Sequence, residues 1–152
     1  MKNLLVLISL LFASPALAAN SVSLENEVFV ERVVEENGKQ TTKLEAPKVV
    51  VPGDKLVFII SYKNDGAEPA TAFVVTNPLP PSIAYEGVEG TLALVSVDGG
   101  TNYGQLAALK IKQPDGTDRA AAAGDVTHIR WTFTQAIPAG GAGKLSFRGV
   151  VK

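Results

Sequence analysis

The sequence predicts an all-β domain, an open antiparallel β-sandwich of about seven to nine short strands. Apolar and polar side chains alternate with a period of two in several segments, most clearly in residues 126–135. Turn-forming pairs such as Asn-Gly and Asp-Gly recur between these segments, and no segment has a convincing helical period. The predicted strands are unevenly spaced, which favours an open sandwich over a closed barrel.

Residues 1–18 have the pattern of a secretory signal peptide. A basic residue near the start precedes an apolar run over residues 4–12, and small residues follow this run. The run is too short to span about 30 Å of hydrocarbon, which disfavours an uncleaved anchor. We therefore expect cleavage between Ala18 and Ala19 and export to the periplasm, the cell surface or the medium. One mature domain should then occupy residues 19–152.

The composition excludes several classes of protein. The chain has no cysteine, so a hydrophobic core must hold the exported domain without disulfides. After removal of residues 1–18 it keeps 15 acidic and 13 of its 14 basic side chains, a formal net charge of −2. With its signs interspersed, this charge should attract neither nucleic acid nor an anionic membrane surface. No later segment is long and apolar enough to cross a bilayer, so we expect no membrane span in the mature chain.

The first predicted strands form a hairpin. Residues 20–25 are polar and are expected to be a loose leader. Valines dominate residues 28–34, and the Asn-Gly pair at residues 37–38 is a strong hairpin signal before a returning strand over residues 39–44. A helix over residues 25–36 remains an alternative, because Glu, Val and Arg also fit a period of 3.6.

The most regular part of the chain is residues 49–83. A strand over residues 56–62 lies between turns at residues 52–54 and 64–66, and a second strand over residues 73–77 ends at a proline-rich stop. One face of the first strand is apolar at every second position, with Leu56, Phe58, Ile60 and Tyr62. Val57 and Ile59 on the opposite face indicate that this face is partly covered as well.

The remaining predicted strands are short and follow at residues 83–85, 91–97, 106–112, 126–135 and 144–152. Residues expected to face inward in the last two strands are Ile129, Trp131, Phe133, Leu145 and Phe147, whereas His128, Arg130, Thr132 and Thr134 are expected to face outward. Residues 118–125 contain four consecutive alanines and fit either a helical turn or a loop.

Three motifs in the central stretch resemble a bacterial surface repeat known as domain of unknown function eleven. They are Val51-Pro52-Gly53-Asp54, Tyr62-Lys63-Asn64-Asp65-Gly66 and the segment 70–80 ending in Asn77-Pro78-Leu79-Pro80. The resemblance covers residues 47–83. It implies an immunoglobulin-like or prealbumin-like sandwich that is exported, often in tandem on large envelope proteins as a spacer or adhesive module. Asn77 stands where the family usually has Asp, the chain holds one copy, and the family has no established catalytic residues to carry over.

Few residues suggest catalysis. His128 is the only histidine, and its predicted outward position without any cysteine nearby disfavours a triad or a zinc site. The chain has neither a nucleophile elbow nor a phosphate-binding glycine loop with its lysine. Glu86 and Glu89 could serve a glycosidase, but they fit a solvated strand edge better. We therefore expect no enzyme and no cofactor.

Two kinds of ligand site remain open. Asp98, Asp115 and Asp118 are weak calcium candidates, although Asp-Gly is also common turn chemistry and neither loop matches a twelve-residue calcium loop. Tyr85, Tyr103 and Trp131 could stack on a sugar, but Trp131 has the period of a core residue. Tyr103 lies in a glycine-bounded loop and is the better candidate for a surface contact.

The leading hypothesis is an exported, non-catalytic structural or interaction module of the bacterial cell envelope, whose partner is a protein or another envelope component. It would bind through exposed loops or through an edge strand that accepts a partner's strand. The glutamates of residues 27–36 are expected to protect that strand against such addition. The alternative hypothesis is a calcium- or carbohydrate-binding β-sandwich domain.

Overall fold

The computed structural model describes residues 21–90 and 92–152, and this part of the chain is all-β. It contains ten strands, all paired antiparallel, and two short 3-10 turns, η1 (Leu106–Ala108) and η2 (Ala123–Asp125). In the described residues no helix has the length and apolar character needed to cross a membrane. The predicted signal peptide over residues 1–18 lies outside the described residues.

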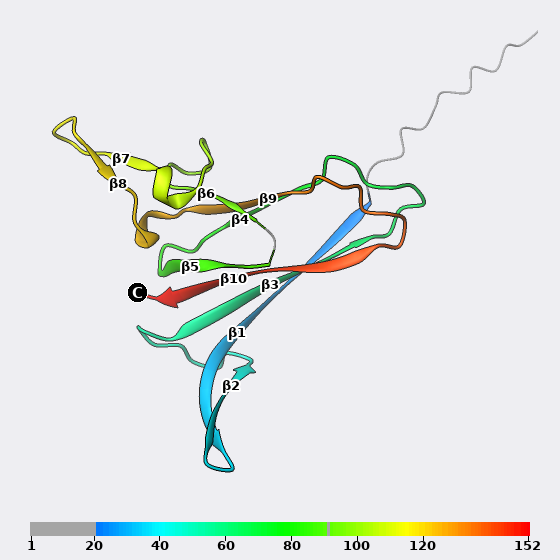
Figure 1. Ribbon diagram of the computed structural model, residues 1–152, viewed down its shortest axis with the longest axis horizontal. Coiled ribbons are helices and arrows are strands. Elements are labelled where there is room, and N and C mark those ends of the chain that lie inside the picture. Colours follow the sequence, from blue (N-terminus) through cyan, green and yellow to red (C-terminus); the bar gives the residue numbers. More distant parts are fainter. Residues whose placement is uncertain (1–20, 91) are drawn as a thin grey trace, which may run out of the picture.

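The strands form two main sheets. In chain order they are β1 (Val22–Glu36), β2 (Lys39–Glu45), β3 (Lys55–Asn64), β4 (Val74–Pro78), β5 (Ile83–Glu89), β6 (Leu94–Ser96), β7 (Lys110–Lys112), β8 (Asp118–Ala120), β9 (His128–Thr132) and β10 (Ala142–Val151). The larger sheet has the order β2-β1-β3-β10-β5, and the smaller has the order β4-β9-β6. Strands β7 and β8 pair only with each other. Figure 1 shows the two sheets as layers, with the β1–β2 and β7–β8 hairpins projecting from them.

The hydrophobic core lies between the two layers. Trp131 of β9 and Phe147 of β10 are both 0% exposed, and their ring centroids are 6.2 Å apart. Phe147 also stacks on Phe58 of β3, with centroids 4.4 Å apart. The inward positions predicted for residues 56–62 and 126–135 are therefore confirmed, because they belong to this core or pack against it. Val57, on the other face of β3, is buried as well.

Two sequence predictions and one alternative are corrected, whereas the strand preferred for residues 28–34 is confirmed. The described residues hold ten strands rather than seven to nine. One reason is that Asp118–Ala120 forms β8, in a segment predicted to be a helical turn or a loop. A helical turn, η2, follows β8 in the same segment. The helix considered for residues 25–36 is wrong, since this segment is part of β1. The loose leader expected over residues 20–25 is also wrong from Val22 onward, because β1 pairs with β3 there. This pairing is long-range, and local polarity does not reveal it.

The core makes a direct prediction about stability. Replacing Phe147 by Ala removes a fully buried ring and its stacking on Phe58, so we expect the free energy of unfolding to fall by about 3–5 kcal/mol in a urea titration. Val33, which is 67% exposed in the β1–β2 hairpin, is the matched control. Its replacement by Ala should change stability by less than about 0.5 kcal/mol. A small effect at Phe147 would contradict a core between the two sheets.

Candidate functional site

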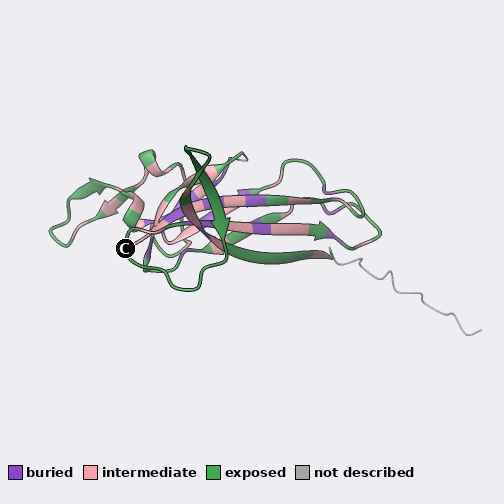
Figure 2. Ribbon diagram, turned by 90° about the horizontal axis from the view of Figure 1, so that it is seen from below, coloured by how far each residue is buried: buried purple, intermediate pink, exposed green. Residues whose placement is uncertain are grey.

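Strand β1 has different neighbours along its two halves. Val22–Val30 pair with β3, whereas Val30–Glu36 pair with β2 on the opposite side of the strand. Within the described residues, no strand pairs with residues 22–29 on the side away from β3. Figure 2 shows this half, which begins where the grey trace ends, as an outermost strand coloured mainly as exposed. We call residues 22–29 on that side the open edge.

The hydrogen bonds beside the open edge show which backbone groups point outward. The N–H of Asp65 donates to the carbonyl of Ser21 at 2.8 Å, which makes this directly opposed pair a hydrogen-bonded one. Hydrogen-bonded and non-hydrogen-bonded pairs alternate in an antiparallel ladder. Odd-numbered residues of β1 therefore bond to β3. The N–H and C=O groups that point away from β3, in the plane of the sheet, belong to the even-numbered residues Val22, Leu24, Asn26 and Val28.

The same even-numbered residues place their side chains on the core side of the sheet. Leu24 lies across from Tyr62 of β3, and Val28 lies across from Phe58. Despite this direction, Leu24 is 48% exposed and Val28 is 37% exposed, so the smaller sheet does not cover this margin of the larger one. The open edge thus combines outward-pointing backbone groups with exposed apolar side chains.

A groove continues from the open edge between the two layers. It has a volume of about 190 Å³. Its walls come from both sheets, with Asn26, Val28, Phe58, Ile60 and Phe147 on the larger and Asn77, Pro78 and Pro80 at the end of β4. The groove places β4 on the same side of the molecule as the open edge of β1.

The edge of β4 is shorter and is limited by proline. The N–H of Phe133 donates to the carbonyl of Phe73 at 3.0 Å, so alternation leaves Val74 and Thr76 with outward backbone groups. Pro78 follows at the next outward position and has no N–H to donate. Prolines at strand edges hinder further pairing. The open edge of β1 is therefore the better docking strand.

The opposite margin of the molecule is better covered. Val95 of β6 exchanges two backbone hydrogen bonds with Gly104, at 2.9 and 3.0 Å. At the end of the larger sheet, η2 lies against β5. Both of these end strands have neighbours from the segment between β6 and β9. The two margins of the molecule are therefore not equivalent.

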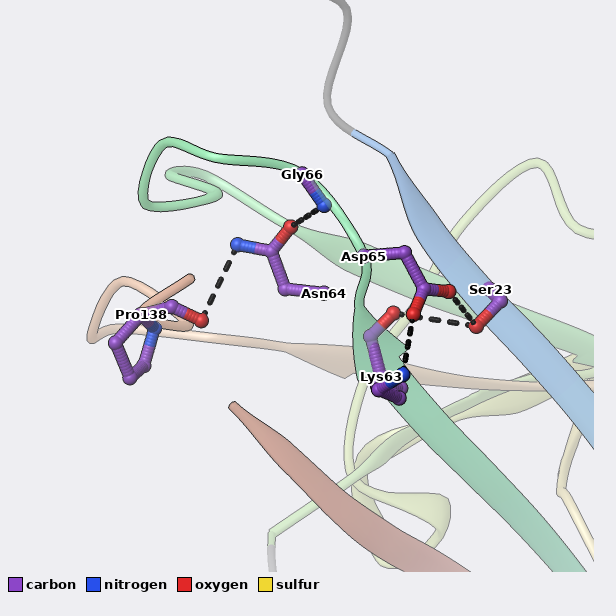
Figure 3. Close-up of polar contacts among 6 residues, drawn as sticks. All are labelled: Ser23, Lys63, Asn64, Asp65, Gly66 and Pro138. Carbon is purple, nitrogen blue, oxygen red and sulfur yellow. Dashed lines mark hydrogen bonds and ion pairs between the residues drawn. The ribbon is translucent and has the colours of Figure 1, made fainter. Parts of the chain in front are cut away.

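Asn64 anchors the loops at the end of β3. Its side chain is 1% exposed, and its Nδ2 donates to the carbonyl oxygens of Glu68, Ile137 and Pro138 at 2.8, 2.9 and 3.2 Å. Its Oδ1 accepts from the N–H of Gly66 at 3.0 Å, as Figure 3 shows with the Pro138 contact. The Asn-Asp-Gly motif predicted a turn here, but not this tie to a loop more than seventy residues away.

Asp65 secures the start of the open edge. Its carboxylate pairs with the ammonium of Lys63 at 2.7 Å and accepts from the hydroxyl of Ser23 in β1 at 2.6 Å (Figure 3). The hydrogen bond from Lys63, followed by that from Ser23, holds the pKa of Asp65 below its usual range. The first residues of β1 are thus fixed to β3, and their backbone is held extended.

Two of the three calcium candidates, Asp98 and Asp115, close their own turns. Asp98 accepts hydrogen bonds from the backbone N–H of Asn102 at 2.9 Å and from the Ser96 hydroxyl at 2.7 Å, which hold its pKa well below the usual range. Asp115 accepts from the N–H and hydroxyl of Thr117 at 2.9 and 2.6 Å. Asp118 lies exposed on β8. In the part of the chain that the structure describes, no three His, Cys, Asp or Glu side chains gather where they could hold a metal ion.

The aromatic candidates also have neighbours. Tyr103 is half-buried, with the guanidinium carbon of Arg130 3.6 Å from its ring centroid. Tyr85 is partly buried against the core, and burial raises the pKa of its hydroxyl. Trp131 is fully buried, as predicted from its period. These three side chains therefore form no shared exposed platform.

The remaining polar candidates are held in structural contacts. His128 lies on β9 with its Nδ1 3.1 Å from the hydroxyl of Thr127. Glu86 pairs with Lys55 at 3.2 Å, and Glu89 pairs with Arg148 at 2.6 Å. The sequence patterns did not predict the open edge, because its first residues were expected to be a loose leader.

In comparisons with known proteins, no family model, no curated protein and no solved structure matched the chain. The resemblance of residues 47–83 to the bacterial surface repeat therefore stays a prediction. We infer function from the geometry of the open edge.

The role of Asn64 predicts a specific loss of stability. Asn64→Ala removes the hydrogen bonds of a buried amide to three carbonyl oxygens and takes the acceptor from the N–H of Gly66, so we expect a loss of about 1–3 kcal/mol in the free energy of unfolding, measured by urea titration. Asn77, whose Nδ2 makes one exposed hydrogen bond to the Pro78 carbonyl, is the matched control. Asn77→Ala should cost less than about 0.5 kcal/mol. Equal effects of the two substitutions would contradict the anchoring role.

The turn around Asp98 predicts sensitivity to acid. Because folding lowers the pKa of Asp98, its contribution to stability is full above the pKa of about 4 that Asp has in an unfolded chain, and it is lost as the pH falls below that value. We expect Asp98→Asn to be less stable than the wild type at pH 7. The difference should shrink between about pH 5 and pH 2.5 in urea titrations. A difference independent of pH would show that the charge is unimportant.

Proposed function

We propose that this chain is an exported, non-catalytic interaction module of the bacterial cell envelope, and that it binds an extended segment of a partner protein along the open edge of β1. In this proposal the two packed sheets are an immunoglobulin-like β-sandwich, as the motifs of residues 47–83 imply. The observation that carries the proposal is the row of outward backbone groups on residues 22–28 beside an apolar groove. An exposed edge of this kind is a template for another strand.

Strand addition uses both features of the open edge. The incoming strand hydrogen-bonds to the N–H and C=O groups of Leu24, Asn26 and Val28, and its main chain supplies most of the affinity. Every second side chain of that strand lies on the core side, next to the exposed parts of Leu24 and Val28. Specificity then comes from these alternate side chains.

The edge is held ready for a partner. The Ser23–Asp65 hydrogen bond fixes one end of the open edge, and pairing with β2 begins at its other end, at Val30. A strand that is already extended loses little conformational entropy when a partner binds, so more of the interaction energy appears as affinity.

Binding is favoured over catalysis because the polar candidates are occupied structurally. Glu86 and Glu89 are in ion pairs with basic side chains. Asp98 closes its own turn through hydrogen bonds to Ser96 and Asn102. The proposal therefore includes no reaction and no cofactor.

A backbone substitution tests the proposal. Asn26→Pro removes an outward N–H while leaving the bonds to β3 in place, because proline is tolerated where the N–H of an edge strand faces solvent. The probes are synthetic peptides of about nine residues in which valine alternates with serine, lysine or glutamate. We expect at least one of these peptides to bind the protein in the form that the cell produces. Asn26→Pro should weaken that binding at least about tenfold, or by about 1.4 kcal/mol.

Two controls make this test decisive. Asn26→Ala keeps the N–H and should bind like the wild type. Amide hydrogen exchange should slow at Leu24, Asn26 and Val28 when a peptide binds, whereas the amides of Glu25 and Glu27 should be protected already in the free protein. If no peptide slows exchange at the outward amides, or if Asn26→Pro binds like the wild type, strand addition at β1 is wrong.

A further inference from the structure

The outer face of the open edge carries two carboxylates that belong to none of the ion pairs among the described residues. The odd-numbered side chains of this segment point away from the core, and the two in its centre are Glu25 and Glu27. In the described part of the chain, neither of them takes part in an ion pair. Farther along the same strand, by contrast, Glu31 pairs with Arg148 and Glu36 pairs with Lys43.

The neighbouring strand does not neutralise these two carboxylates. Across the ladder, Glu25 lies opposite Ser61 and Glu27 lies opposite Ile59, so neither faces a basic residue. Lys63, a basic side chain of β3 near this edge, pairs with Asp65 at 2.7 Å. The charge of Glu25 and Glu27 is therefore available to a strand that docks on the other side of β1.

This charge disfavours pairing between two copies of the chain. If two open edges met antiparallel about Asn26, Glu25 of each copy would lie opposite Glu27 of the other. Like charges directly opposite each other destabilise a strand pair, and charged residues on edges are a known protection against self-association. The same two glutamates would favour a strand that places lysine or arginine opposite them.

We propose that the open edge of β1 selects an extended protein segment in which apolar residues alternate with lysine or arginine. This inference rests on the proposed function and adds the chemistry of the partner. The apolar residues of the segment lie beside Leu24 and Val28 on the core side of the sheet. Its basic residues stand opposite Glu25 and Glu27 on the outer face, while the backbone groups between them complete the ladder.

The test compares peptides that differ only in charge. Three peptides of about nine residues, with valine alternating with lysine, serine or glutamate, are titrated against the protein as the cell produces it. We expect the lysine peptide to bind about tenfold more tightly than the serine peptide, and the glutamate peptide to bind most weakly. The advantage of lysine should shrink at high salt, because these charges are exposed.

A charge reversal identifies the residues responsible. The double variant Glu25→Lys/Glu27→Lys should reverse the order, so that the glutamate peptide binds most tightly. The matched control is Glu35→Lys/Glu68→Lys, which makes the same change in net charge at two exposed positions away from the open edge. The control should keep the preference for lysine.

The possible results separate this inference from the proposed function. Equal affinities for the three peptides, with the amides of Leu24 and Val28 protected in each complex, would overturn the charge preference and leave strand addition standing. Absence of binding and of protection for all three peptides would overturn both proposals. Sedimentation at neutral pH could also show a wild-type dimer in which hydrogen exchange finds these amides protected. That result would overturn the inference that the charge of the open edge disfavours pairing between copies of the chain.

Discussion

The packing of Phe147 against Phe58 and Trp131 holds the two layers of this protein together. These rings come from β10, β3 and β9, the strands that run through the middle of the two sheets. Because the chain has no disulfide, this contact and the aliphatic residues around it must keep the smaller sheet on the larger one.

A difference in width between the two sheets creates the open edge. The smaller sheet has three strands and the larger has five, so one layer cannot cover the whole of the other. On one side, η2 and the bond between Val95 and Gly104 occupy the margin. On the other side, Leu24 and Val28 stay exposed although they face the core layer. The proposed binding surface therefore arises from incomplete cover of one sheet by the other.

An exposed edge that binds a partner must also avoid unwanted pairing. These two edges, on β4 and β1, differ in their protection: Pro78 limits β4 by removing a backbone donor, whereas the open part of β1 keeps its donors and carries Glu25 and Glu27. A carboxylate repels a second copy but leaves the backbone able to bond to a basic strand. The charge of an edge strand can thus exclude one partner and favour another.

Local side-chain order predicted most of the strands and the inward faces of the central ones. The alternation around Trp131 and Phe58 predicted burial correctly, because a period of two places every second side chain on one face regardless of distant contacts. The candidate site could not be predicted in this way. Whether residues 22–29 have one neighbour or two depends on where β2 ends relative to β3, and the anchoring by Asn64 depends on a loop near Ile137. Only the tertiary structure decided which edge stayed open, because the backbone N–H and C=O groups that form the edge are the same in nearly every residue.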